Sequence, residues 1–283
     1  SSLVGSEMCI RDSIGLVSNN FHNPVFLEVF DRFTRVLQER GLRPLLVNLS
    51  DETNPSHSVR MLRQYSVDAV IVASSTLPAS FAKEFHDAGV PVVHSFGRHT
   101  QNPRVHIVGI DNFAAGRLAA NVLIDRGYRR IGMMGGPETA TSAQDRLAGF
   151  LAVTVAHPDI DVSHVYADDY SFEAGRKEMT RLLAQRRAEA YFCGDDVLSI
   201  GALSAAQSAG LSVPDDIGIL GLNDMEMAGW QNINLTTIHN PIDKIVDASI
   251  ELIVSMLDDP DQSPQARLFD CHLVERGTLK NPA

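Results

Sequence analysis

The sequence is poor in cysteine, short of positive charge and without a long apolar run. It holds three cysteines in 283 residues, Cys9, Cys193 and Cys271, which are widely spaced and form no Cys-x-x-Cys pair. An odd, scattered set of this kind is not a disulfide framework and favours a reducing compartment. Because no stretch of about 18 apolar residues occurs, the sequence predicts no membrane-spanning helix.

The shortage of positive charge bears on nucleic-acid binding. Lysine and arginine total 24 against 35 aspartates and glutamates, which gives a formal net charge of −11. Such a surface repels nucleic acid unless a compact basic module offsets it. The densest basic stretches, 126–130 and 176–187, are interleaved with apolar or acidic residues, as solvated helix faces and turns are. We therefore expect that this chain does not bind DNA by itself.

Signature motifs of several enzyme classes are missing as well. The glycines within 132–136 lack the spacings of dinucleotide and phosphate loops, and no G-x-S-x-G elbow occurs. His94, His99 and His106 have no nearby cysteine or carboxylate triad to complete a metal site. We expect no cofactor, no metal and no enzymatic activity. A dehydrogenase on a doubly wound fold stays open as an alternative, because fold alone does not determine function.

What the sequence does have is a regular alternation of short apolar strands and amphipathic helices. Continuous apolar runs such as 69–73 are typical of parallel strands buried on both faces, and alternation with helices predicts parallel sheets covered on both sides. The predicted strands are 14–17, 44–48, 69–73, 91–94, 105–110, 130–134, 161–166, 190–193, 217–220, 235–238, 267–269 and 271–275. The predicted helices are 25–40, 57–65, 80–88, 113–126, 141–155, 171–186, 198–209 and 241–257.

The pattern restarts near residue 130, and no long linker separates its two parts. We expect an α/β protein of two similar doubly wound parallel-sheet lobes with a cleft between them. The N-terminal lobe is predicted at 14–112 plus 240–268, and the C-terminal lobe at 113–239 plus 269–283. Residues 1–13 have neither a clear period nor the regions of a secretory signal, and we expect a non-native or disordered leader there, with an extra strand as the alternative.

Polar side chains follow two consecutive strands in the second half. Asp195 and Asp196 come after 190–193, and Asn223 and Asp224 come after 217–220. Ligands of open α/β sheets bind outside the carboxyl ends of the strands, so a binding cleft is predicted here. Asp196 is expected to cap the following helix, which leaves Asp195 for a ligand. The pair Asn223 and Asp224 also suits a turn or a helix cap.

Several motifs appear in one order along nearly the whole chain. They are Ile14-Gly-Leu-Val with Asn23-Pro24, Val108-Gly-Ile-Asp-Asn112, Arg146-Leu-Ala-Gly-Phe150, Phe192-Cys-Gly-Asp-Asp196, Val213-Pro-Asp-Asp-Ile217, Gly221-Leu-Asn-Asp224, Leu235-Thr-Thr-Ile238 with Pro241, and Leu273-Val-Glu-Arg-Gly277. In this order and spacing the chain resembles the effector-binding region of lactose-repressor (LacI/GalR) type transcription regulators, which share the fold of periplasmic sugar-binding proteins. The helix-turn-helix with which such regulators begin has no counterpart here.

The resemblance implies roles for individual residues. Arg146 matches the family arginine that reaches the effector, although it could instead cap its helix. Asn223 occupies a ligand-contacting position that usually holds aspartate, and Tyr170 falls where purine-type repressors place a stacking aromatic, with the edge of the core as its alternative. Asp111 is expected either to contact the ligand or to cap a helix. The full set of expected ligand-binding residues is Asn20, Phe21, Phe26, Ser74, Arg98, Asp111, Arg146, Tyr170, Asp195, Asn223 and Asp224.

The polar set also bears on the ligand and on the function. Several acidic or amide groups against one favoured arginine favour a neutral polyhydroxylated effector, by preference a sugar, and a nucleoside belongs to the same class. The resemblance implies the ligand-sensing core of a cytoplasmic transcription regulator that is a homodimer, has no membrane contact, and meets operator DNA only through an N-terminal head missing from this sequence. The alternative is a periplasmic sugar-binding protein of a transporter.

Overall fold

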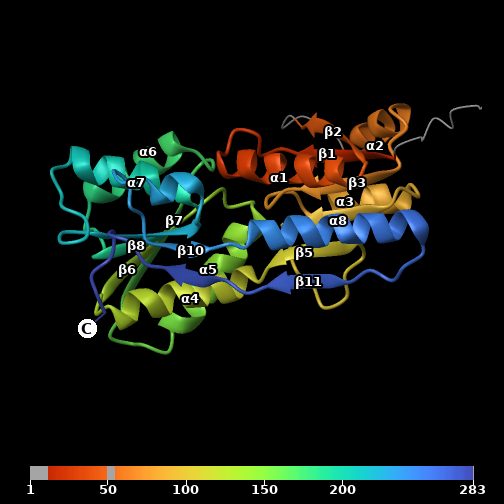
Figure 1. The fold of residues 1–283 in the computed structure, drawn as a ribbon. Coiled ribbons are helices and arrows are strands. Elements are labelled where there is room, and N and C mark those ends of the chain that lie inside the picture. Colours follow the sequence, from red (N-terminus) through yellow and green to blue (C-terminus); the bar gives the residue numbers. More distant parts are fainter. Residues whose placement is uncertain (1–11, 50–54, 283) are drawn as a thin grey trace, which may run out of the picture.

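Two six-stranded sheets form the two halves of the protein in the computed structural model, which describes residues 12–49 and 55–282 (Figure 1). We call the first sheet with its helices the first lobe, and the second sheet with its helices the second lobe. The first sheet has the spatial order β11 (Ala266–Phe269), β5 (His106–Ile110), β4 (Val92–Ser95), β3 (Ala69–Ala73), β1 (Ser13–Ser18), β2 (Arg43–Asn48), and the pairings are parallel.

The second sheet has the corresponding strand order. Its strands are β12 (His272–Val274), β10 (Thr237–His239), β9 (Gly218–Asn223), β8 (Ala190–Cys193), β6 (Arg130–Gly135), β7 (Asp161–Tyr166). They pair in parallel except β12, which runs antiparallel to β10. In both sheets the second strand along the chain lies at one edge and the third lies on the other side of the first. Crevices open at such reversals of strand order, and this places ligand loops after β1, β3, β6 and β8.

Eight α-helices cover the sheets within the described residues. In the first lobe they are α1 (Val25–Glu39), α2 (Pro55–Gln64), α3 (Ala79–Asp87) and α8 (Ile242–Asp258). In the second lobe they are α4 (Asn112–Asp125), α5 (Thr141–Thr154), α6 (Phe172–Leu183) and α7 (Asp196–Ser208). A short 3₁₀ turn, Glu226–Gly229, follows β9.

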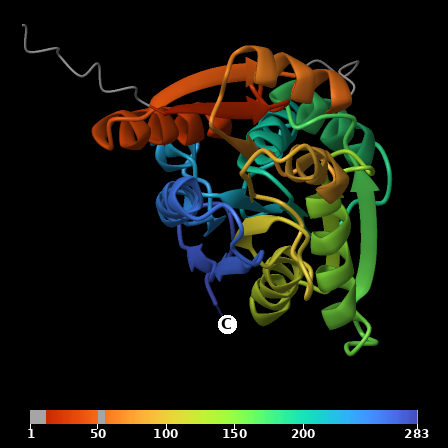
Figure 2. The same cartoon turned by 90° about the vertical axis from the view of Figure 1, so that its right-hand side faces the viewer.

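The strand β3 shows why the sheets are covered on both faces. All five of its residues are fully buried, and successive side chains point to opposite faces. Ile71 joins the core beneath α1 and α8, whereas Val70 and Val72 join a separate cluster beneath α2 and α3. The helices α1 and α8 lie side by side, as the end-on view shows (Figure 2), and the ion pair of Arg32 with Asp247, 2.7 Å from Nη2 to Oδ2, links them.

Within the described residues, the chain passes between the lobes three times. The passages run from β5 to α4 at 110–112, from β10 to α8 at 239–242, and from β11 to β12 at 269–272. Their ends are neighbours, because Ile110 pairs with Phe269 and His239 pairs with His272. The three passages therefore form one narrow waist.

The predicted fold class is confirmed: both sheets are parallel-dominated and doubly wound. Each predicted strand and helix is present, with ends that differ from the expected ones by up to three residues. Most of the predicted leader, residues 1–11, lies outside the described residues, and Ser13 already belongs to β1. Asp196 does not cap α7 as expected. The side chain of Asp195 is the cap, since its Oδ1 accepts from Val197 N at 2.9 Å.

Candidate functional site

Two adjoining hollows lie between the carboxyl ends of the two sheets. The inner hollow is narrow, with a cavity volume of about 30 Å³, and the outer hollow is wider, with a cavity volume of about 410 Å³, the size of a small-ligand site. The inner hollow is lined by Val25, Phe26, Val29, Ser75, Phe96, Ile110, Asn112, Arg146, Asp195, Asn223, Asn240 and Ile242. The outer hollow is lined by Asn19, Asn20, His22, Asn23, Thr76, Pro137, Thr139, Ala140, Asp168, Asp169 and Tyr170.

Arg146 on α5 brings a buried guanidinium to the inner hollow. Only 5% of the residue is exposed, and two hydrogen bonds hold the group: Nε donates to Asn112 Oδ1 at 2.8 Å, and Nη1 donates to the carbonyl of Gly194 at 2.5 Å. These bonds leave further N–H groups of the fork for a ligand, because a guanidinium carries five donors. Asn112 is the first residue of α4, and Gly194 lies just before α7. The guanidinium therefore links the N-terminal ends of α4 and α7.

Asp195 is the point at which the lobes meet. Its Oδ1 caps α7, and its Oδ2 accepts from Asn23 Nδ2 of the first lobe at 2.9 Å and from Asn223 Nδ2 of the second lobe at 3.0 Å. Asn23 lines the outer hollow and Asp195 lines the inner one. The hydrogen bond between them therefore lies at the boundary of the two hollows and closes the cleft across the lobes.

The two adjacent carboxyls share a buried environment but differ in role. Burial raises the pKa of Asp195, although the hydrogen bonds from Val197, Asn23 and Asn223 oppose this rise. Burial raises the pKa of Asp196 to about 7. Asp196 accepts from Thr237 Oγ1 at 2.6 Å and from Met225 N at 2.9 Å. It ties α7 to β10 and to the loop after β9, away from both hollows.

The backbone is strained where it enters the inner hollow. Phe96 has φ 66°, and Asn223 and Asp224 at the end of β9 have φ 122° and 58°. Side-chain-bearing residues rarely adopt these values, and such conformations cluster at functional sites. Phe96 contacts Phe26 edge-on, with ring centroids 5.8 Å apart, and both rings line the apolar side of the inner hollow.

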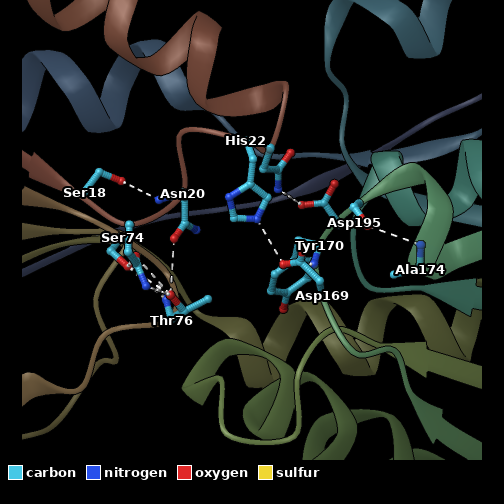
Figure 3. Close-up of polar contacts among 12 residues, drawn as sticks. Ser18, Asn20, His22, Ser74, Thr76, Asp169, Tyr170, Ala174 and Asp195 are labelled. Atoms are coloured by element: carbon cyan, nitrogen blue, oxygen red, sulfur yellow. Dashed lines mark hydrogen bonds and ion pairs between the residues drawn. The ribbon is translucent and has the colours of Figure 1, made fainter. Parts of the chain in front are cut away.

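The outer hollow is polar and is bridged at its mouth. His22 of the first lobe points toward Asp169 of the second lobe, with 3.0 Å between Nε2 and Oδ1, as Figure 3 shows. Asn20 accepts from Thr76 Oγ1 at 3.2 Å along one wall. Tyr170 forms part of the other wall and is 4% exposed; burial raises the pKa of its hydroxyl, which lies 3.3 Å from Ser142 Oγ.

The hollows are lined by six of the residues expected from the sequence. Phe26, Arg146, Asp195 and Asn223 line the inner hollow, and Asn20 and Tyr170 line the outer one. The structure thus brings together residues from the loop after β1, from α1, from α5 and from the ends of β7, β8 and β9.

Three other expected residues make local contacts outside the hollows. Phe21 stacks on Phe30 at 4.4 Å between ring centroids, because the loop after β1 turns this side chain toward α1. The Ser74 hydroxyl donates to Asn19 Oδ1 at 2.8 Å, and the backbone N–H groups of the next turn donate to it.

Asp111 caps α4, and its Oδ1 accepts from Ala114 N at 2.9 Å. Capping is therefore the alternative that the structure shows for this residue.

Side-chain partners on other elements account for the remaining two expected residues. Arg98 reaches across the lobes to Asp145 on α5, with 3.0 Å between Nε and Oδ2. Asp224 is held by Arg276, with 2.6 Å between Nη2 and Oδ1, and by His239, with 2.9 Å between Nδ1 and Oδ2. Neither lines a hollow; Arg98 braces the cleft and Asp224 braces the strained turn after β9.

Sequence reasoning predicted Asn223 but missed the other two amides of the inner hollow, Asn112 and Asn240. It also missed the hydrogen bond from Asn23 to Asp195 at the boundary of the two hollows. Asn112 directly follows a strand–cap pair, and Asn240 follows β10 and precedes a proline. The available signal was a polar residue next to a strand end. At 111–112 that signal led to Asp111, which caps α4, and not to its neighbour Asn112, which lines the inner hollow.

Within residues 12–49 and 55–282, no helix is long and apolar enough to span a bilayer. No group of three or more histidine, cysteine, aspartate or glutamate side chains there is placed to hold a metal ion.

The chain is similar in sequence to periplasmic binding protein-like domains and to a known repressor. The profile of the periplasmic binding protein-like domain family matches residues 120–279. The HTH-type transcriptional repressor PurR of Klebsiella pneumoniae (strain 342) is 30% identical over 272 residues, which are 94% of this chain and 80% of that repressor.

Solved structures agree in fold. The transcriptional regulator CelR, solved as a cellobiose complex, is 25% identical with a TM-score of 0.82, and the match covers 95% of this chain and 85% of that one. A LacI family transcriptional regulator from Enterococcus faecium with bound ribose is 22% identical with a TM-score of 0.82 and matches 96% of this chain and 100% of its own. The likeness to the latter concerns the fold alone.

Proposed function

Because the chain belongs to the LacI family of transcription regulators, of which it is the effector-binding region, we propose that it senses a small neutral polyhydroxylated effector between its lobes. The observation that supports this proposal is the convergence of Arg146, Asp195 and Asn223, far apart in sequence, on the inner hollow. Each of these side chains offers hydrogen bonds in a rigid orientation, because each is itself held by a neighbour.

The charge balance of the inner hollow supports a neutral effector. It contains one guanidinium and one carboxylate, and the remaining polar groups are a hydroxyl and amides. An anionic ligand would need positive charge beyond Arg146, because a buried charge must be paired. Adjacent hydroxyls suit the paired donors and acceptors of guanidinium and amide groups.

The neighbours support a sugar as the preferred effector. Structures of similar regulators contain cellobiose and ribose. The similarity to PurR, together with Tyr170 in the outer hollow, keeps a nucleoside in the same class of ligands. Phe26 and Phe96 would cover the apolar face of either kind of ligand.

In the proposed mechanism the effector changes how the lobes sit relative to one another. The two moving bodies are the first lobe and the second lobe, which the three passages of the waist connect. A ligand that contacts both favours one lobe arrangement only by its difference in affinity for the two, and a coupling of about 1–3 kcal/mol is typical of such switches. In a cytoplasmic homodimer, that motion would set the spacing of two DNA-reading heads and so the operator affinity.

A thermal-shift measurement tests the proposal. Ribose, cellobiose and a set of nucleosides are added to the purified chain, and at least one should raise Tm, as a ligand of the native state must; at 100 times its Kd the gain is about 2.7 kcal/mol. Arg146→Ala and Asn223→Ala should abolish the shift. Arg186→Ala, an exposed arginine of the second lobe, is the matched control and should keep it. Stabilisation by anionic metabolites alone would contradict the proposal.

A further inference from the structure

One buried acceptor in the inner hollow has no partner. Asn240 is 6% exposed and lines the inner hollow, and within the described residues its Oδ1 makes no hydrogen bond. An unpaired buried acceptor is costly, because it has lost its hydrogen bonds to water without replacement, so native proteins rarely leave one without a partner. The position of this atom points to a hydrogen-bond donor that arrives with a ligand.

The orientation of the Asn240 amide follows from a chain of hydrogen bonds that starts at Asp195. The carboxylate oxygen only accepts, so Asn223 must turn its Nδ2 toward Asp195, and the distance between them is 3.0 Å. The Oδ1 of Asn223 then faces Asn240 and can only accept, so Asn240 donates to it from Nδ2 at 3.2 Å. This leaves the Oδ1 of Asn240 for the hollow.

Backbone hydrogen bonds hold the side chains of this hydrogen-bonded series in place. The N–H of Asn240 donates to the carbonyl of Asn223 at 3.3 Å, and the N–H of Ile242 donates to the carbonyl of Asn240 at 2.7 Å. The Asn240 side chain therefore starts from a fixed position, and only rotation of its amide could exchange oxygen for nitrogen. The carboxylate of Asp195, two side chains away, opposes that rotation.

We infer that the inner end of the effector carries a hydrogen-bond donor, a hydroxyl in a sugar or nucleoside, which Asn240 Oδ1 accepts. Val29, Ile110 and Ile242 line the same hollow as Asn240 and make part of its wall apolar. The effector is thus expected to present one hydroxyl on an otherwise carbon-rich edge. This inference rests on the proposed function for its ligand class. It adds that Asp195, through Asn223, determines that Asn240 presents an acceptor and not a donor to the hollow.

The test uses two small probes of similar shape, isopropanol, which can donate a hydrogen bond, and acetone, which only accepts. Each is titrated into the unliganded chain while the side-chain amide resonances of Asn240, assigned with Asn240→Leu, are followed by NMR. The alcohol should give a saturable shift at an affinity about fivefold to tenfold above that of the ketone, as one hydrogen bond provides. Equal affinities, a preference for acetone, or no saturable shift from either probe would overturn the inference.

A variant tests the role of Asp195 directly. Asp195→Asn puts an N–H₂ where the carboxylate oxygen accepts, so Asn223 can present Oδ1 to it and Nδ2 to Asn240, which then presents Nδ2 to the hollow. The preference should invert toward acetone. Asp258→Asn, the same change at the exposed end of α8, should leave the alcohol preference unchanged. A merely structural role of Asp195 would weaken both probes alike, and that result would count against the inference. If Asp195→Asn does not fold, the probe pair in the wild type decides.

The outcome is distinguishable from failure of the proposed function. If no sugar or nucleoside raises Tm while the wild type still prefers isopropanol at Asn240, the proposed ligand class is wrong, whereas the inferred orientation of the Asn240 amide is supported. A sugar that stabilises the chain equally well when any one of its hydroxyls is replaced by hydrogen would do the reverse.

Discussion

Asp196 is a fully buried carboxyl that bonds to two groups on separate elements. It accepts from Thr237 on β10 and from the backbone N–H of Met225, and burial raises its pKa to about 7. Because the native state holds its proton more tightly than the unfolded chain does, folding takes up a proton between about pH 4 and about pH 7. The contribution of this residue to stability is therefore largest at the acidic end of that window and falls as the pH rises.

Asp196→Asn should remove this slope. The free energy of unfolding of the wild type relative to the variant should fall by roughly 2–4 kcal/mol from pH 4 to pH 7.5. The variant can keep both hydrogen bonds if the Thr237 hydroxyl turns to accept. Urea unfolding of both proteins across this pH range gives the difference between their free energies of unfolding. Burial lowers the pKa of His94 to about 4, so His94 contributes a pH dependence of the opposite sign. Because both proteins contain His94, its contribution cancels in the difference. Parallel pH profiles would contradict the role assigned to Asp196.

Single residues also show how far sequence reasoning reaches. The strand-end rule located Asp195 and Asn223 because parallel strands deliver their ends to one edge. It could not decide which of two adjacent polar residues faces the hollow. At 111–112 the aspartate caps the helix and the asparagine faces inward, whereas at 195–196 the capping residue is also the one in the hollow. That choice depends on the packing of the other lobe, which local chemistry does not contain.

At the scale of elements, glycines let α4 and α5 approach closely. A Cβ on Gly116 would lie 2.0 Å from the backbone oxygen of Arg146, and one on Gly149 would lie 1.9 Å from that of Phe113. The two glycines thus sit at reciprocal contacts of the same pair of helices. Since α5 carries Arg146 and α4 begins at Asn112, this contact sets the spacing between the guanidinium and the amide.

Gly149→Ala should separate α4 from α5 and move Arg146 away from Asn112. We expect a stability loss of about 1–3 kcal/mol or more from overpacking, together with a lower affinity for any sugar that stabilises the wild type. Gly175→Ala is the control, because its Cβ would lie 2.3 Å from the Leu198 oxygen on the α6–α7 contact. It should cost stability without a matching loss of affinity, which calorimetric titration of both variants can measure. Equal losses of affinity would refute the link to Arg146.

Element bounds were largely predictable, and element contacts were not. Strands such as β3 are continuous apolar runs, and helices α1 and α3 end where Gly41 and Gly89, both at φ 76°, allow the chain to turn. These are local signals. The close approach of α4 and α5 depends on which helix faces meet in three dimensions, and nothing in the spacing of Gly116 and Gly149 indicates it.

At the scale of the whole molecule, polar links join the lobes at several places around the cleft. Asn23 bonds to Asp195, His22 pairs with Asp169, Arg98 pairs with Asp145, and Glu28 Oε1 accepts from Glu226 N at 2.8 Å. Each link exists only while the lobes are close. Together they favour the closed arrangement, and a ligand in the hollows would add to them.

Arg98→Ala should shift the lobes toward an open arrangement. The pair is partly exposed, so its loss should cost only about 0.5–1 kcal/mol and lower the affinity for a stabilising sugar about twofold to fivefold. Arg186→Ala removes a similar pair with Asp161 inside the second lobe and should not change the affinity. Calorimetric titration, with small-angle scattering of the unliganded chain for its radius of gyration, measures both effects. An unchanged affinity and radius in Arg98→Ala would show that this link does not hold the cleft.

The waist of three neighbouring passages has a topological consequence. Cutting the backbone at any one of them, 110–112, 239–242 or 269–272, would leave two covalent tethers, so nicked protein would still migrate as one particle until denatured. Three neighbouring passages restrict separation of the lobes more than a single linker would. We therefore expect the lobes to move relative to one another chiefly by rotation about the waist.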